Sequence, residues 1–209
     1  MKKWFTMLLV AAVLFSVALA EMPQAVGNLI PATAQLVDME MDDGLRVYEY
    51  RDGNTRYDVS MRGDTVLMMK TTNPADDAVP AQTDEALLAE LLKLLPDAAV
   101  DGVYHVKDDG RQRRVAFLRK GGDVYEVVTE ADSAKVMRMT QIFGAGEITS
   151  LPDAWRSVQD AKGAAAVIDV ELEFDDGRLV YQGDASLNGR KFEFEILAEN
   201  GKLLQWEND

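Results

Sequence analysis

The chain of 209 residues contains no cysteine and a single histidine, His105. Without cysteine there is no disulfide framework, no thiol nucleophile and no residue for a lipid anchor. A Ser-His-Asp triad could be built only on His105, and a histidine-based zinc site would lack further ligands. The sequence also has no glycine-rich phosphate loop and no G-x-S-x-G turn. We therefore expect a protein that is not an enzyme and has no catalytic residues, no cofactor and no metal site.

Long apolar runs are absent except at the start of the chain. Lys2 and Lys3 precede an apolar stretch over residues 4–18, and Ala18-Leu19-Ala20 places small residues at the cleavage positions. Residues 1–20 are thus predicted to be a signal peptide. An uncleaved anchor is the alternative, although the run is shorter than the roughly 20 residues of a membrane span. We expect a secreted, periplasmic or cell-envelope protein with no stable membrane span after cleavage.

Basic residues are scarce. The chain has 22 Lys and Arg against 36 Asp and Glu, a net charge of −14, and loss of Lys2 and Lys3 with the signal peptide would bring it to −16. Such a charge repels nucleic acid and anionic lipid, so neither is an expected partner. It suits a basic protein partner, and it is also an ordinary means of keeping an exported protein soluble.

One phrase occurs three times: Asp-Asp-Gly at residues 42–44, 108–110 and 175–177, at spacings of 66 and 67 residues. Asp-Gly is common in the hairpin turns of any β-rich protein, but a long period with a fixed order of marks indicates three copies of one module. An aromatic, an acidic and a hydrophobic residue follow each phrase, as Tyr57-Asp58-Val59, Tyr125-Glu126-Val127 and Phe192-Glu193-Phe194.

Each copy shows helical spacing of apolar residues and then alternating strand patterns. The third helix opens at Pro152 and Asp153, the second runs from Thr83 to Pro96 with six leucines, and the first can extend only over 24–30. We expect the second helix to be the best buried. The predicted fold is α+β, with three tandem units that are each a helix packed on an antiparallel β-meander of about four strands. The predicted boundaries are 1–20 for the signal peptide and 21–72, 83–140 and 151–209 for the units.

The third unit resembles a PepSY domain, a family in which a helix precedes strands with a central Asp-Asp-Gly turn. The second unit matches more weakly, because Arg113-Arg114 stands where Val-Tyr is expected, and the first lacks a full helix. The motif consists mostly of turn and core residues, so it is specific for fold more than for activity. The resemblance in the third unit covers about 55 residues and is carried by 154, 167–172, 175–181, 192–195 and 200–204.

The resemblance implies an exported, non-catalytic module, since PepSY domains occur in propeptides of secreted metallopeptidases and in cell-envelope proteins. Related PepSY-like repeats resemble the fold of proteins that inhibit β-lactamase. We therefore expect a binding module that restrains a secreted peptidase or other hydrolase, with another exported protein as its partner. A structural cell-envelope protein without inhibitory activity is the alternative.

His105 and one basic run are the cationic features that could have a function. His105 lies in an expected strand where Tyr104 and Val106 face the core, so its side chain should face outward as a solvated histidine, with pH sensing or metal binding as alternatives. The basic run could dock an acidic partner, or it could pair with acidic faces of the adjoining units. It consists of Arg111, Arg113, Arg114, Arg119 and Lys120.

Acidic and aromatic residues on strands supply the remaining candidates. Two acidic rows could offer oxygen ligands to calcium, but neither has Ca-loop spacing, so charged solvent faces are expected. Aromatic side chains on strands are candidate anchors for a partner, since Tyr and Trp dominate interface hot spots. The rows are Asp38, Glu40 and Asp42, and Asp169, Glu171 and Glu173; the aromatic candidates are Tyr48, Tyr50, Tyr181 and Trp206.

Overall fold

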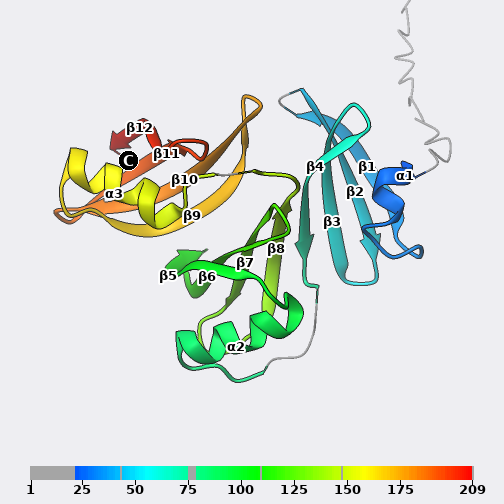
Figure 1. The fold of residues 1–209 in the computed structure, drawn as a ribbon, viewed down its shortest axis with the longest axis horizontal. Helices are drawn as coiled ribbons and strands as arrows, with labels where there is room; N and C mark the ends of the chain where they lie inside the picture. The colour runs from blue at the N-terminus through cyan, green and yellow to red at the C-terminus, as the bar shows by residue number, and fades with distance from the viewer. Residues whose placement is uncertain (1–21, 43, 75–78, 109, 147, 209) are drawn as a thin grey trace, which may run out of the picture.

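The computed structural model describes residues 22–208 except 43, 75–78, 109 and 147, so the predicted signal peptide lies outside the described residues. In this part of the chain a helix followed by four strands occurs three times (Figure 1). None of the helices described is long and apolar enough to cross a membrane. The helices are α1 (Gln24–Gly27), α2 (Asp84–Leu94) and α3 (Leu151–Lys162).

The strands form two antiparallel sheets. The larger has the order β1-β2-β3-β4-β8-β7-β6-β5, and the smaller has the order β12-β11-β10-β9. The strands of the larger sheet are β1 (Gln35–Asp42), β2 (Leu45–Asp52), β3 (Thr55–Arg62), β4 (Thr65–Thr72), β5 (Ala99–Asp108), β6 (Arg111–Lys120), β7 (Asp123–Glu130) and β8 (Val136–Ile142). Those of the smaller are β9 (Ala166–Asp175), β10 (Arg178–Leu187), β11 (Arg190–Leu197) and β12 (Lys202–Asn208).

The predicted α+β fold of three helix-on-meander units is wrong. The described chain is mostly β, with one sheet of eight strands, a second of four and three short helices. The first two predicted units share a sheet because β4 pairs with β8, from Met68↔Ile142 to Thr72↔Arg138. An unpaired edge leaves N–H and C=O groups without partners. Alternation along one strand does not reveal which distant strand will meet that edge, so the sequence pattern could not show this junction.

Hairpin turns follow the Asp-Gly signals wherever those residues are described. Gly44, Gly110 and Gly177 have φ of 75°, 77° and 72°, and Asp176 has φ of 48°. Two successive residues with positive φ form the turn whose twist suits a two-residue hairpin. Asp43 and Asp109, the middle residues of the first two phrases, lie outside the described residues. The turn chemistry was therefore readable from the sequence where the sheet partners were not.

The three helices bury different amounts of surface. Thr83 caps α2 by accepting a hydrogen bond from the N–H of Ala86, and Ser150 caps α3 in the same way. The expectation that the leucine-rich helix is best buried is wrong, because α2 buries two residues, whereas α3 buries four. Leu94 of α2 is 62% exposed, since α2 covers the sheet with one stripe only.

Apolar side chains pack in three clusters on the two faces of the eight-stranded sheet. On one face, α1 covers β1–β4 and α2 covers β5–β8, with Leu87 and Leu91 on Leu118. On the other face, β6 presents Phe117 to Tyr181 of the smaller sheet, with ring centroids 5.7 Å apart in an edge-to-face arrangement. The neighbouring residues Phe117 and Leu118 thus serve opposite faces, as strand alternation requires.

We predict that Gly183→Ala destabilises the four-stranded sheet strongly. Gly183 has φ of 155°, and a Cβ added there would lie 2.2 Å from the carbonyl oxygen of Asp169 on β9. Because that oxygen belongs to the paired backbone, the substitution should lower the free energy of unfolding by about 3 kcal/mol.

Gly189→Ala is the matched control, because Gly189 has φ of 76° but an added Cβ would meet nothing within 4 Å. Its cost should be about 1 kcal/mol, from backbone strain alone. Denaturant unfolding of both variants tests this, and equal losses would contradict the steric explanation.

Candidate functional site

The two sheets meet at a buried carboxylate. Glu126 of β7 is 1% exposed, and its Oε2 accepts a hydrogen bond of 2.6 Å from the N–H of Leu172 on β9. β9 is an edge strand of the four-stranded sheet, so this N–H has no strand partner on that side. A side chain of one sheet therefore satisfies the open edge of the other.

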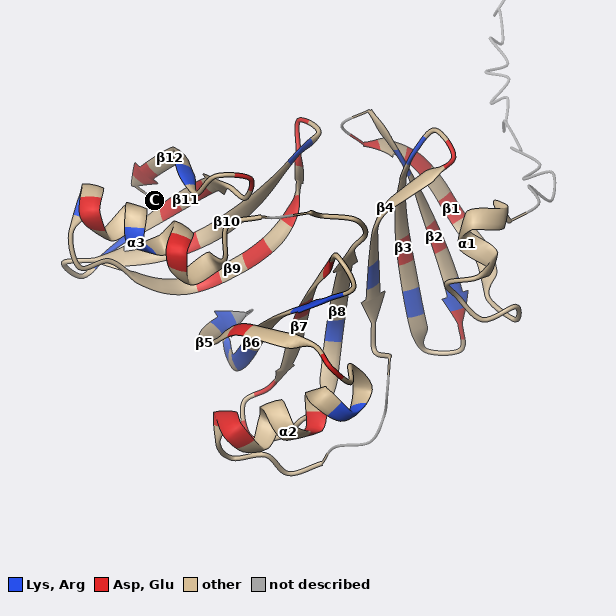
Figure 2. Cartoon of the chain, viewed as in Figure 1, with Lys and Arg blue, Asp and Glu red and all other residues tan. Residues whose placement is uncertain are grey.

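Arg138 of β8 extends this contact into an inter-sheet ion cluster of Lys70, Glu126, Arg138 and Glu171. Arg138 Nη2 lies 3.2 Å from Glu126 Oε1, and its Nη1 lies 2.9 Å from Glu171 Oε1. Lys70 Nζ lies 3.5 Å from Glu171 Oε2. Figure 2 shows acidic bands along β9 and basic bands on β4 and β8. Two carboxylates from different sheets thus share one guanidinium.

The two carboxylates of the cluster have different proton affinities. Burial raises the pKa of Glu126 to about 7, although Arg138 acts in the opposite direction. Burial also acts to raise the pKa of Glu171, but Arg138 and Lys70 outweigh it and hold that pKa below its usual range. Full removal of Glu126 from water is the decisive difference, since desolvation disfavours the charged form. Only one of the two is thus set to titrate near neutral pH.

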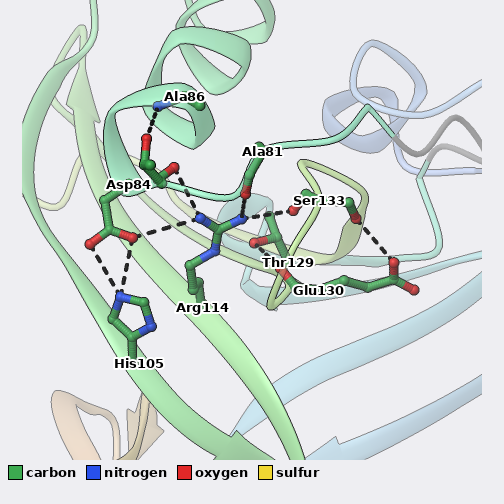
Figure 3. A network of polar contacts seen from close by, with 9 residues as sticks. Ala81, Asp84, Ala86, His105, Arg114, Thr129, Glu130 and Ser133 are labelled. Atoms are coloured by element: carbon green, nitrogen blue, oxygen red, sulfur yellow. Dashed lines mark hydrogen bonds and ion pairs between the residues drawn. The ribbon is translucent and has the colours of Figure 1, made fainter.

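Arg114 of β6 is the centre of a second polar network (Figure 3). Its side chain is fully buried, at 0% exposure. Nη2 donates to the carbonyls of Ala81 at 2.6 Å and Ser133 at 3.1 Å, and Nη1 donates to that of Thr83 at 3.1 Å. Arg114 therefore fastens the segment before α2 to the loop between β7 and β8.

His105 belongs to the edge of this network. Its side chain is 64% exposed and its Nε2 lies 3.1 Å from Asp84 Oδ1. The residues that flank His105 in sequence, Tyr104 and Val106, both pack in the core between the two sheets, as the sequence pattern predicted. The pairing with Asp84 was not predicted, because the helix start that carries Asp84 is brought to the strand by the fold alone.

The basic run of β6 is not a single surface. Arg114 is buried under α2, whereas Arg119 extends on the other face of the strand to Asp101 at 2.6 Å and to the carbonyl of Ile148 at 2.8 Å. Arg111 is exposed, and Arg113 and Lys120 are half-buried. Strand alternation thus splits the run, so it does not form the single surface that docking of an acidic partner would use. Pairing with acidic faces of adjoining units also fails for Arg114, because it binds backbone carbonyls and its acidic partner, Asp84 at 3.7 Å, belongs to the same unit.

The two acidic rows have different surroundings. Asp38, Glu40 and Asp42 are exposed along β1. In the second row, Glu171 belongs to the inter-sheet ion cluster, and Glu173 accepts a hydrogen bond from Gln182. The expectation of a charged, solvent-exposed face is therefore correct for the first row. It is wrong for Glu171 of the second row, which binds Arg138 of the other sheet.

The face of the four-stranded sheet opposite α3 is open and acidic. It contains a hollow of about 400 Å³, in which Asp184 pairs with Lys191 at 3.1 Å. Among the described residues, no group of three or more His, Cys, Asp or Glu side chains is placed to hold a metal ion. Five of the nine residues that line the hollow are carboxylates. Its lining is Asp169, Glu171, Gln182, Gly183, Asp184, Glu193, Phe194, Glu195 and Gln205.

The aromatic residues expected to be anchors lie mostly in the core. Tyr48, Tyr50 and Tyr181 are 5%, 1% and 1% exposed. Trp206 is half-buried and stacks on Phe192 with ring centroids 5.0 Å apart. Tyr48 and Tyr50 lie on the strand face that α1 covers, and Tyr181 packs edge-to-face on Phe117 of the other sheet.

Sequence reasoning missed Glu126 and Arg138. A signal was present, since Glu126 interrupts an otherwise apolar strand and lies at the centre of the repeated triplet. Buried carboxylates require a partner, but Arg138 is two strand positions into β8 and nothing local marks it as that partner.

We predict that stability falls between about pH 4.5 and pH 7 and that Glu126→Gln removes most of this dependence, the remainder coming from Glu173 and Glu195, whose pKa values burial also raises. The pKa of Glu126 is raised in the folded state to about 7, so the folded protein binds more protons than the unfolded chain above about pH 4.5. The protonated Glu126 side chain thus contributes stability at low pH, and this contribution, on the order of 3 kcal/mol, is lost as the pH rises toward 7.

Urea unfolding of both proteins at several pH values measures this difference. The pKa of Glu171 is lowered, so Glu171 stays charged throughout the window and does not contribute to the slope. Parallel profiles for the two proteins would show that Glu126 does not titrate there.

We predict that Arg114→Leu lowers the free energy of unfolding by about 3–5 kcal/mol, because it leaves buried carbonyls without donors. Arg113→Leu is the control, since Arg113 directly precedes Arg114 in β6 and is half-buried. Its effect should stay within about 0.5 kcal/mol. Thermal unfolding of both variants is the measurement, and equal losses would show that strand position, not the carbonyl contacts, sets the cost.

Known proteins resemble the C-terminal part of the chain. Residues 153–207 match the model of the PepSY family, described as "Peptidase propeptide and YPEB domain". No curated protein matches the sequence significantly. Similar solved structures include a candidate lipoprotein from Clostridium difficile 630, with 13% identity over 65% of this chain and 97% of that chain and a TM-score of 0.35.

Two further structures share the low level of likeness. A cysteine-rich secretory protein from Staphylococcus aureus subsp. aureus Mu50 has 14% identity over 52% of this chain and 38% of that chain, with a TM-score of 0.31. The Bacillus megaterium YpeB C-terminal domain has 11% identity over 86% of this chain and 91% of that chain, with a TM-score of 0.29. The family match spans α3 from Asp153 and all of β9 to β11 with most of β12. Residues 153–207 of this chain are therefore a PepSY domain, in the segment where the sequence resemblance was strongest.

Proposed function

We propose that this protein is an exported, non-catalytic binding module that restrains a secreted peptidase or another hydrolase. The observation that carries the proposal is the PepSY domain at residues 153–207, a family described as a peptidase propeptide. A propeptide acts by occupying a surface of its enzyme, which requires shape and charge rather than reactive groups. The predicted signal peptide at residues 1–20 supports a location where such enzymes work.

The open face of the four-stranded sheet is the surface that suits this role. It is backed by α3, whose Trp155 packs on Phe194 with ring centroids 4.9 Å apart, so the strands are held from behind. The hollow on the open side is lined by five carboxylates among its nine residues, which favours a basic patch on the partner. A stable complex buries about 800 Å² on each partner. We propose that the hollow and the exposed strand residues around it form that area.

We also propose that residues 21–72 and 83–140 derive from the same ancestral module as the PepSY domain. The repeated triplet supports this, because Tyr57, Tyr125 and Phe192 each begin it on the third strand after a helix, in β3, β7 and β11. In this proposal the three copies began as separate sheets, and the first two joined into one sheet when β4 paired with β8.

The predicted activity can be measured directly. The purified protein is titrated against peptidases and other hydrolases that the same cell secretes, with substrate turnover and complex formation followed in parallel. At least one enzyme should be bound and slowed at micromolar protein, without cleavage of the inhibitor. Gly183→Ala, which disturbs the PepSY sheet, should weaken inhibition, and Gly189→Ala should not. If no hydrolase is bound or slowed, the proposal fails and a structural role in the cell envelope takes its place.

A further inference from the structure

Strand β1 is the unpaired edge of the eight-stranded sheet, opposite β5 in the strand order. All of its residues except Leu36 are exposed. Three of them are large apolar residues, Val37 at 49%, Met39 at 55% and Met41 at 67% exposure. An open edge of this length presents backbone donors and acceptors together with apolar surface, which is what an added strand requires.

Among the described strands, the edges β5 and β9 cover each other, whereas β12 is a further open edge. The N–H of Leu172 on β9 binds Glu126, and β5 packs against β9, with Asp101 held by Arg119. Trp206 of β12 stacks on Phe192 and is half-buried. β1 has no lysine and no proline, two devices with which proteins usually guard an edge, although a bulge lies between Leu36 and Asp38. Among the described edge strands, β1 thus combines an open edge with three exposed large apolar residues, whereas no large apolar residue of β12 is exposed.

The side chains of β1 alternate in chemistry. Asp38, Glu40 and Asp42 lie on one face, and Met39 and Met41 lie on the other. The N–H of Met39 donates a hydrogen bond of 2.8 Å to Asp38 Oδ1, an acceptor on β1 itself. Because backbone groups of successive residues alternate between the two sides of an antiparallel strand, those of Met41 share the free side with Met39. Successive residues of a strand added to β1 would therefore lie alternately beside apolar and acidic side chains.

A second copy of this chain is a poor occupant. Antiparallel pairing of β1 with itself, centred on Glu40, would place three carboxylates of each copy opposite three of the other, and like charges directly across a strand pair are destabilising. A segment with basic residues at alternate positions and apolar residues between them would place opposite charges across the pair and cover Met39 and Met41. Charge complementarity therefore selects one class of partner.

We propose that β1 captures an extended segment of a partner protein by strand addition, and that this segment alternates basic and apolar residues. The inference deepens the proposed function and rests on it, since the segment would belong to the restrained enzyme or to a protein that presents it. The attachment is separate from the PepSY domain, which would leave the acidic face of the smaller sheet free for the same partner.

A synthetic peptide of alternating lysine and valine is the probe. Fluorescence anisotropy with the purified protein should show binding at least tenfold tighter than for a peptide of the same composition with the lysines in one block. Hydrogen exchange should show the Met39 and Met41 amides protected when the alternating peptide is bound. Equal binding of the two peptides would overturn the proposal, because bulk charge alone would then explain it.

Two variants localise the contact. Met39→Pro removes the outward N–H and should reduce binding at least tenfold, with circular dichroism used to check that the sheet remains folded. Glu40→Lys should weaken the lysine peptide about threefold to tenfold and strengthen a matching glutamate peptide. Glu207→Lys is the control for charge, because Glu207 is exposed on the edge strand β12 of the other sheet, and it should leave binding unchanged. A Glu40→Lys protein with unaltered peptide preference would contradict the proposal even if Met39→Pro fails to fold.

The remaining outcomes separate this inference from the proposed function. Inhibition of a hydrolase that persists in Met39→Pro would keep the proposed function and exclude strand addition. Peptide binding without any hydrolase target would exclude the proposed function and keep the edge as a binding site. A dimer that Met39→Pro abolishes would assign β1 to a second copy of the chain and overturn the proposal. Protection of the Met39 amide without peptide, at every protein concentration, would assign β1 to residues 1–21 and would also overturn it.

Discussion

The hydrogen bond from the N–H of Leu172 to the carboxylate of Glu126 is the contact on which the arrangement of the two sheets depends. It joins an edge strand to a strand interior, so it fixes one position along β9 against one position along β7. Removing a carboxylate from water is costly. Arg138 offsets that cost, and Arg138 is itself bound by Glu171 from β9. Each sheet thus contributes an acid to the same guanidinium, and neither sheet can move without breaking a charged contact.

The repeated triplet shows how one sequence position acquires three roles. Its acidic residue is Asp58 in β3, Glu126 in β7 and Glu193 in β11. Asp58 pairs with Arg56 at 2.8 Å beside the sheet junction, Glu126 is buried between the sheets and Glu193 is exposed in the open hollow. The backbone position is equivalent in each case. The environment is supplied by whichever strand or sheet packs over it, and that environment decides whether the acid is solvated, paired or protonated near neutral pH.

The sequence allowed the turns, the helix starts and the PepSY segment to be predicted, because these depend on residues close together in the chain. Gly177 and the cap at Thr83 are local features of this kind. The pairing of β4 with β8 and the partnership of Glu126 with Arg138 depend on segments that only the folded chain brings together, so periodicity could not show them. The aromatic candidates failed for a related reason. Tyr50 and Tyr181 lie on strands, but a strand pattern does not state which face a helix will cover.

The junction of β4 with β8 has a consequence for the order in which the chain can fold. The paired residues are roughly 70 positions apart, and contacts so distant in sequence form late. A chain delivered from its N-terminus would complete β1 to β4 while β8 was still missing, so β4 would present a free edge for the whole of that interval. Partly folded chains with open edges associate readily. The first half of this chain is therefore open to association through β4 until the second half supplies β8.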